Sequence, residues 1–175
     1  MPKPSIQTSI HGRRFGLGPK SELIFNDANA GLQGGRVRPQ HTVRRVITAA
    51  QVLTLFTTPV TLVAAPGAGK VLLPNRLTAY KSAGTAYVVD AGEDVAVIHT
   101  GGAALISIAS ATFLASAGAQ FRVAERLPAL PTTLNLQTAS NTALQLTILV
   151  GNVATGNSPL VVDLEYEVLD LTLSV

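Results

Sequence analysis

The sequence predicts a mainly β protein, with a jelly-roll or β-sandwich body over residues 46–175, one or two short helices within it, and an extended N-terminal arm over residues 1–45. Three observations lead to this fold class. Short apolar runs recur along the body with Gly, Asn and Pro between them, which is typical of sandwiches and jelly rolls. Hydrophobic residues make up 47% of the 175 residues and charged residues only 13%, about half the usual charged share. Basic residues and chain breakers concentrate in the first 45 residues.

The arm is predicted from its charge and its breakers. Residues 1–45 contain eight Lys/Arg and two Asp/Glu, a net charge of 8 − 2 = +6, whereas residues 46–175 have 5 − 8 = −3. Gly and Pro are frequent in the arm and no apolar periodicity is sustained, so we expect it to fold poorly alone and to become ordered on a partner. Three roles stay open: an extended strand on an acidic protein surface, a solvated tail, or a nucleic-acid contact. The strand-like stretches "SIQTSI" and "SELIF" favour the first role, and the wide spacing of the basic residues disfavours the third.

The body begins with a predicted helix, and strands follow it. Thr48 is a suitable N-cap for "TAAQVLTLF", which places Val52, Leu55 and Phe56 on one face. "SIASATFLAS" is the second helical stretch. Strands are predicted within residues 59–66, 70–82, 85–89, 94–100 and 119–125.

The last two strands have the clearest patterns. "TALQLTILV" places Leu144, Leu146, Ile148 and Val150 on one face. "SPLVVDLEYEVLDL" alternates apolar and acidic residues, as expected of a strand with one buried and one wet face. Because only the loop "GNVATGNSP" separates these two strands, we expect them to form a long antiparallel pair.

The stretch "LVAAPGAGKVLLP" is superficially similar to a phosphate-binding loop. Gly69 and Lys70 match that motif, but Ala64 stands at its first Gly and Val71 at its metal-binding hydroxyl. Pro74 also follows too early for the helix that such a loop must open. We therefore predict a tight turn between two strands, and an ATP-binding role for Lys70 is the weakest of the functions considered.

No catalytic, cofactor or metal site is predicted. The chain has no Cys and no Gly-x-Ser-x-Gly elbow, and His11, His41 and His99 lack partners at metal-ligand spacing. "DAGED" is too short for a calcium loop and is predicted to be a solvated hairpin turn. We also expect no signal peptide and no transmembrane segment, because Pro and polar residues interrupt each uncharged stretch.

Two longer stretches, "LTLFTTPVTLVAAPGAGKVLLPNRLTAY" and "VATGNSPLVVDLEYEVL", resemble a family of small structural proteins of tailed double-stranded DNA bacteriophages. The opening "PSIQTSIHGRRFGL" is similar to the arm that precedes their jelly-roll-like domains. The resemblance covers about residues 1–20 and 48–170, and its motifs are turn signatures.

The resemblance implies a capsid decoration (cement) protein. Such proteins form trimers on the capsid exterior and clamp neighbouring subunits of the major capsid protein. The implied partners are therefore the major capsid protein and copies of this chain in a homotrimer, with no small-molecule substrate, no membrane and no direct nucleic-acid contact. The implied location is the virion exterior, with the host cytoplasm during assembly. The arm residues expected to contact the capsid are Ile6, Ile10, Arg13, Arg14, Phe15, Leu23, Ile24, Phe25, Arg44 and Arg45.

The alternative is a tail-fibre or baseplate β module that binds glycans on the host surface. A glycan-binding surface usually presents aromatic rings for stacking. The chain has three Tyr and no Trp, so the decoration protein is favoured.

Overall fold

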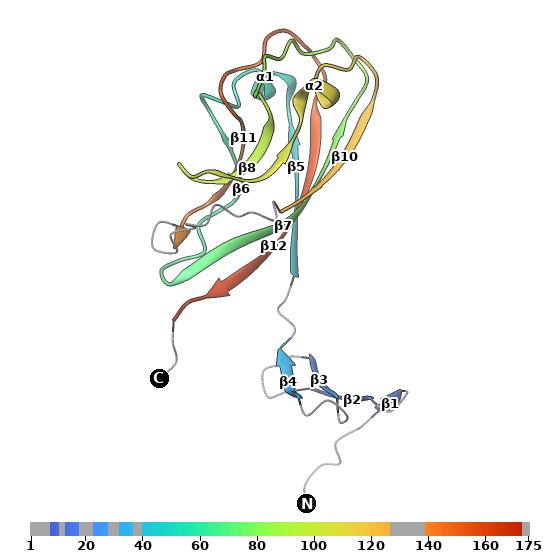
Figure 1. Cartoon of the computed structure of the whole chain (residues 1–175), viewed down its shortest axis with the longest axis vertical. Helices are drawn as coiled ribbons and strands as arrows, with labels where there is room; N and C mark the ends of the chain where they lie inside the picture. Colours follow the sequence, from blue (N-terminus) through green and yellow to red (C-terminus); the bar gives the residue numbers. More distant parts are fainter. Residues whose placement is uncertain are drawn as a thin grey trace, which may run out of the picture. The chain divides into compact units, whose positions relative to one another are not determined.

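The chain divides into two compact units, Met1–Pro39 and Gln40–Val175 (Figure 1). The computed structural model describes residues 40–126 and 139–172 with their side chains, together with the backbone of four short strands within the first 39 residues. The division falls at residue 39, whereas the sequence placed the end of the arm at residue 45. Residues 40–45 belong to a strand of the body, because they pair with a strand near the C-terminus.

The N-terminal unit contains β1 (Thr8–Ile10), β2 (Arg13–Leu17), β3 (Leu23–Asp27) and β4 (Leu32–Arg36). These strands pair antiparallel in chain order, β1-β2-β3-β4. This arrangement differs from the single extended arm that the sequence suggested.

The body is built from two four-stranded sheets. The β5 sheet has the order β10-β7-β12-β5 and the β6 sheet has the order β6-β11-β8-β9. The β5 sheet consists of β5 (Gln40–Ile47), β7 (Lys70–Lys81), β10 (Gln120–Glu125) and β12 (Leu160–Asp170). The β6 sheet consists of β6 (Val60–Val63), β8 (Val95–His99), β9 (Ala104–Ile108) and β11 (Leu144–Ile148).

The strand pairing is that of a jelly roll. The first body strand pairs with the last, β5 with β12, and the next pairs are nested inside: β6 with β11, β7 with β10, and β8 with β9, all antiparallel. Two further pairs, β12 with β7 and β11 with β8, join these ribbons into the two sheets. The eight strands therefore confirm the predicted jelly-roll or β-sandwich fold class.

The predicted pairing of the last two strands is wrong. β11 lies in the β6 sheet and β12 in the β5 sheet, so residues 149–159 cross between sheets instead of closing a hairpin. Both edges of β11 are used by β6 and β8, and both edges of β12 by β5 and β7. A loop rich in Gly and Asn serves a crossing as well as a hairpin, which is why the sequence pattern did not separate the two.

The first helix is shorter than predicted. α1 (Ala49–Val52) has the predicted N-cap, with a capping box between Thr48 and Gln51. Val52 and Leu55 are buried as expected, but Phe56 is 44% exposed. The helix ends at Val52, so Phe56 lies in the following turn and does not continue the buried face.

Two other predicted elements also differ from the structure. α2 (Ser110–Phe113) covers only the middle of the second helical stretch, because residues 107–108 belong to β9, a strand that the sequence reasoning missed. Of the strand predicted over residues 85–89, the structure has an isolated bridge between Val88 and Ala154.

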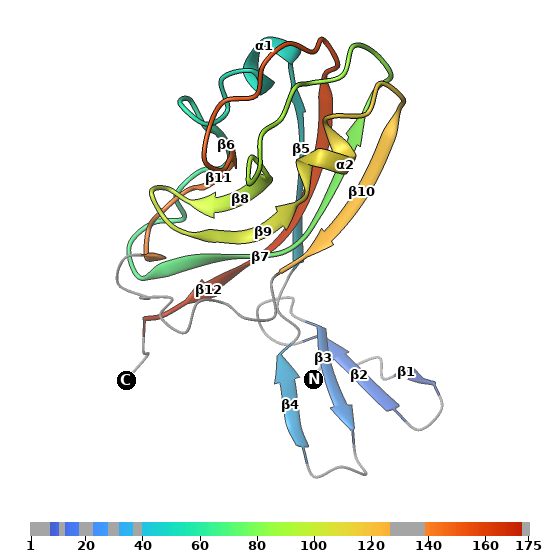
Figure 2. The same ribbon diagram turned by 45° about the horizontal axis from the view of Figure 1, so that its top comes forward.

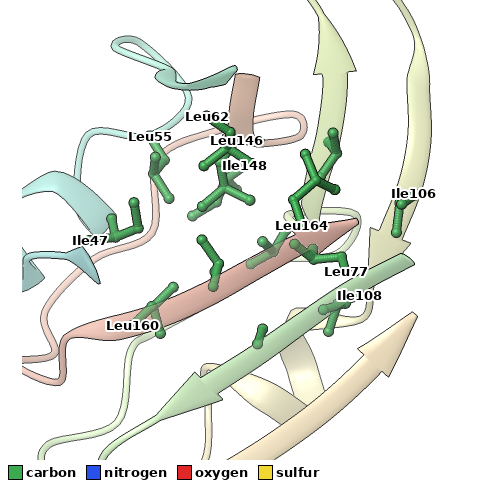
Figure 3. Close-up of a cluster of buried hydrophobic side chains, with 14 of the residues drawn as sticks. Ile47, Leu55, Leu62, Leu77, Ile106, Ile108, Leu146, Ile148, Leu160 and Leu164 are labelled. Atoms are coloured by element: carbon green, nitrogen blue, oxygen red, sulfur yellow. The ribbon is translucent and has the colours of Figure 1, made fainter. Parts of the chain in front are cut away.

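The core lies between the two sheets. Leu77, Leu160 and Leu164 of the β5 sheet face Ile106, Leu146 and Ile148 of the β6 sheet, and all six are fully buried (Figure 3). Ile47 and Leu55 extend this cluster to the end of the sandwich that carries α1 and α2, which we call the apical end (Figure 2). Four connections lie at this end: residues 48–59, 82–94, 109–119 and 149–159. Neither helix in the described part of the chain is long and apolar enough to cross a membrane.

Candidate interaction surface

The Gly-Lys stretch forms the predicted turn between β6 and β7. Gly67 and Gly69 have φ angles of 100° and 73°, and Lys70 is the first residue of β7. The turn is held from two sides: the Gly67 amide donates to Asn141 Oδ1 at 2.9 Å, and the Leu171 amide donates to the Gly69 carbonyl at 2.7 Å. A strand follows the turn where a phosphate-binding loop opens a helix, so the geometry differs from a phosphate-binding loop.

The histidines of the body have structural contacts. His99 ends β8, as predicted, and its buried ring places Nε2 2.8 Å from the Leu72 carbonyl oxygen. His41 in β5 stacks on Tyr166 at 5.3 Å between ring centroids. His11 lies outside the described residues.

The acidic residues of "DAGED" are used within their own turn and the neighbouring helix. Glu93 is buried and accepts a hydrogen bond from the Asp90 amide at 2.7 Å, and Asp94 accepts one from the Ser110 amide at 3.1 Å. Within residues 40–126 and 139–172, no group of three His, Asp or Glu side chains is placed to hold a metal ion.

The predicted capsid-contacting residues fall in four strands. Ile10 ends β1; β2 and β3 contain the next six, Arg13, Arg14, Phe15, Leu23, Ile24 and Phe25. Ile6 lies outside the described residues. Arg44 and Arg45 are in β5, where Arg44 Nε lies 3.5 Å from Asp163 Oδ1. Contact of any of these residues with a capsid stays a prediction.

A row of apolar residues crosses the outer face of the β5 sheet. The strand registers align Phe121 with Tyr80, Tyr80 with Val161, and Val161 with Val46, one residue from each strand. We call these four residues the outer-face row. Neighbouring strands are about 4.8 Å apart, so the row is roughly 14 Å long. Phe121, Tyr80 and Val46 are 59%, 44% and 65% exposed, and Val123 beside them is also exposed.

The charges next to the outer-face row are paired within the chain. Arg44 pairs with Asp163 in the next row of the same face, and Arg76 pairs with Glu165 one row further along. Gln40 Nε2 also donates to Glu165 at 2.9 Å. A partner that covers the row therefore contacts apolar side chains. The nearby carboxylates of Asp163 and Glu165 are already paired with arginines of the same chain.

A second exposed apolar group lies on the apical loops. Phe56, Val88 and Val150 are exposed there, and we call these three residues the apical patch. Their loops are joined by hydrogen bonds: the amides of Phe56 and Thr57 donate to Asn152 Oδ1. Val150 has a φ of 73°, a left-handed conformation that a β-branched residue rarely adopts.

A lysine is buried beneath the apical loops. Lys81 ends β7 and is fully buried, and its Nζ donates to the Ser82 carbonyl at 3.3 Å and to the Gly118 carbonyl at 3.2 Å. Among the residues with described side chains, no carboxylate lies within salt-bridge distance of it. Burial lowers the pKa of Lys81 below its usual value.

The sequence matches no protein-family model and no curated protein. Among solved structures, it is similar to a chain of "Cyanophage Pam1 capsid asymmetric unit", with 18% sequence identity and a TM-score of 0.44. The match covers 81% of this chain and 96% of that chain. At this level of similarity the match assigns no function to the protein.

Proposed function

We propose that this chain is a structural virion protein of a tailed bacteriophage: a capsid decoration protein that binds the outside of the head as a trimer. Its body stabilises contacts between major capsid protein subunits, and its N-terminal unit reaches over neighbouring subunits. The motifs shared with the phage family support this role. The observation that carries it in the structure is the outer-face row, an exposed apolar surface on a sandwich with no metal-binding group among its described residues.

The outer-face row fits a surface that another protein covers. Single exposed apolar residues are common, but residues aligned across four adjacent strands form a continuous surface, and such surfaces mark interaction sites. The neighbouring ion pairs lower the cost of covering the face, because each charge keeps its partner when water is excluded. An apolar and internally neutralised face suits permanent packing against protein.

The N-terminal unit would add charge-dependent attachment. Residues 1–39 contain six Lys/Arg and two Asp/Glu, a net charge of 6 − 2 = +4. Exposed ion pairs contribute only about 0–1 kcal/mol each, so the cations would orient the unit while its apolar and backbone contacts supply most of the adhesion. Arg44 and Arg45 contribute to the body instead, since β5 contains both.

Co-sedimentation with undecorated capsids tests this function. We expect the full chain to bind, a chain starting at Gln40 to bind more weakly, and the double variant Arg13→Gln, Arg14→Gln to lie between them. Binding that depends on charge should also weaken with salt, because the Debye length falls from about 10 Å at 0.1 M to about 3 Å at 1 M. Equal binding by the chain starting at Gln40 would show that the N-terminal unit is not a clamp.

The tail-fibre or baseplate module is kept as a second candidate because Tyr80 and Phe121 are adjacent, exposed aromatic residues. Such rings offer faces on which sugars stack. A host-surface polysaccharide that bound the full chain, and lost binding in Tyr80→Ala, would favour this candidate if capsids also failed to bind.

A further inference from the structure

We infer that the N-terminal unit binds through one apolar face of its sheet, and that this face packs on an apolar surface of the same capsid protein that the body binds. The inference rests on the proposed function. It specifies which residues of the unit make the contact and which chemistry the partner surface has.

The strand registers divide the residues of β1–β4 between two faces. Successive residues of a strand lie on opposite faces, and residues that are opposite each other in an antiparallel pair lie on the same face. Phe15 is opposite Thr8 on one side and Phe25 on the other. Leu17 is opposite Leu23. One face therefore contains most of the large apolar residues of these strands, and we call the following five residues the arm face: Ile10, Phe15, Leu17, Leu23 and Phe25.

The opposite face of the same sheet is polar and basic. Arg14 is opposite Ser9 on one side and Asn26 on the other. Ile24 is opposite Arg36 on this face. Two of the three arginines in β1–β4 therefore lie on the opposite face, and the third, Arg13, lies at one end of the arm face, opposite Ile10.

The arm face needs a second layer to cover it. In the described part of residues 1–39, β1–β4 form a single antiparallel sheet, and no helix accompanies it (Figure 2). A sheet with one apolar face gains stability when that face is buried against another element. The composition of the arm face therefore suits a surface that a partner covers.

The size of the arm face argues against a dimer of two such faces. Four strands about 4.8 Å apart, each up to five residues long, give a face of roughly 300 Å². Two copies packed face to face would bury roughly 600 Å² in total, whereas stable interfaces bury about 1,200–2,000 Å². Each unit also has a charge of 6 − 2 = +4, so two units repel each other. We therefore assign the contact to a different protein surface.

The body supplies the contact area that the arm face lacks. Residues 37–39 alone separate β4 from β5, so a partner bound to the body is present to the arm face at a high effective concentration, in the millimolar range for a short linker. A small apolar face then strengthens attachment without having to bind alone. The partner surface is apolar rather than acidic, because Arg14 and Arg36 lie on the opposite face.

Two adjacent residues give a matched pair of substitutions. Phe25 is on the arm face and Ile24 is on the opposite face, so Phe25→Ser and Ile24→Ser each remove a large apolar residue from a different side of one strand. In co-sedimentation with undecorated capsids, we expect Phe25→Ser to weaken binding of the full chain at least about tenfold, as at an interface hot spot, and Ile24→Ser less than about twofold. The loss in Phe25→Ser should persist from about 0.1 M to about 1 M salt, since salt screens charges and not apolar contacts.

A cross-linking experiment verifies the sheet without a capsid. The chain has no Cys, so two introduced cysteines can pair only with each other within one chain. Arg14 and Asn26 are directly opposite, at a Cα separation of about 4.5–5.5 Å that a disulfide spans, whereas Ser9 and Asn26 are two strands apart, about 10 Å. Arg14→Cys with Asn26→Cys should cross-link under mild oxidation, with Phe25 intact and in the Phe25→Ser background. Ser9→Cys with Asn26→Cys should not.

The outcomes separate the inference from the proposed function. If the wild type binds capsids and the two serine variants lose affinity equally, the function stands and the arm face is wrong. Equal cross-linking of both cysteine pairs would also overturn the arm face, because its residues are assigned from the register. If Phe25→Ser alone lowered the unfolding temperature of the body in the free chain, the face would be covered within its own chain and the inference would be wrong. If the wild type fails to bind capsids, the decoration function fails and the partner inferred here fails with it.

Discussion

Val150 combines an exposed side chain with a backbone conformation that disfavours it. Its φ is 73° and its side chain is 70% exposed, so little burial offsets the strain. The left-handed conformation costs a non-glycine residue about 1–2 kcal/mol, and Asn tolerates it better.

We expect Val150→Asn to raise the free energy of unfolding by about 0.5–1 kcal/mol, because Asn relieves this strain. The measurement is urea denaturation of both proteins at the same protein concentration. Val88→Asn, at an exposed valine without positive φ, is the control and should change stability little. A loss of stability in Val150→Asn equal to that of the control would argue against backbone strain.

Lys81 makes stability depend on pH. Burial lowers its pKa in the folded protein, so between that pKa and the usual value of 10.5 the unfolded chain binds more protons than the folded chain. The free energy of unfolding therefore rises with pH across this window. Tyr87 acts in the opposite direction at higher pH: burial raises its pKa, so the unfolded chain ionises first and stability falls above about pH 10.

Replacing Lys81 by Met should remove the rise. We expect the stability of the wild type to increase relative to Lys81→Met from neutral pH up to about pH 10, measured by urea denaturation at each pH. Lys70→Met removes a lysine from the same strand and is the matched control. Parallel curves for the wild type and Lys81→Met would contradict a lowered pKa of Lys81.

The turn between β6 and β7 shows how an element is determined by its neighbours. Gly67 and Gly69 both have positive φ, but a Cβ at Gly67 would meet nothing within 4 Å, whereas one at Gly69 would lie 2.7 Å from Thr172 Cγ2. β7 follows the turn and pairs with β12, and its first residue, Lys70, lies opposite Asp170.

These two glycines give a matched pair of substitutions. Gly67→Ala should cost about 1–2 kcal/mol, from the left-handed conformation alone. Gly69→Ala should cost clearly more, because Thr172 must also move. Thermal unfolding of both variants measures the difference, and equal losses would mean that the C-terminal segment does not hold the turn.

Other elements show where local patterns are insufficient. The capping residues of α1 were recognisable, since a capping box depends on residues only three apart. The sequence pattern did not predict β9. Its Ala- and Ser-containing sequence continues directly into α2, with no turn signal between the strand and the helix. The partners of β11 and β12 depend on which edges other strands already use.

At the scale of the whole molecule, the body begins at Gln40. Eight residues of β5 pair with β12, from Gln40 opposite Glu167 to Ile47 opposite Leu160. Truncation before Gln40 leaves this edge strand whole, whereas truncation before Val46 removes most of it.

We expect a chain starting at Gln40 to unfold at the same temperature as the body of the full chain. A chain starting at Val46 should lose about 3 kcal/mol or more, since several backbone hydrogen bonds of about 0.5–1.5 kcal/mol each disappear. Differential scanning calorimetry of the two truncated chains measures this. Equal stability would place the body boundary at residue 46, as the sequence had suggested.

The sequence by itself determined the properties that depend on near neighbours. It predicted a mainly β body with one or two short helices, the turn at Gly69, the cap at Thr48 and the basic N-terminal region. These signals have periods or spacings of a few residues, so a single strand or turn contains them completely.

Only the tertiary structure decided which strands pair. That pairing in turn formed the candidate surface. Val46, Tyr80, Phe121 and Val161 are distant in the sequence, and each is an apolar residue at a position that alternation assigns to the wet face. Alternation places a residue on a face but contains no information on the neighbouring strand. Burial of the two inner faces against each other selected the jelly-roll order, and that order aligned these four residues in one exposed row.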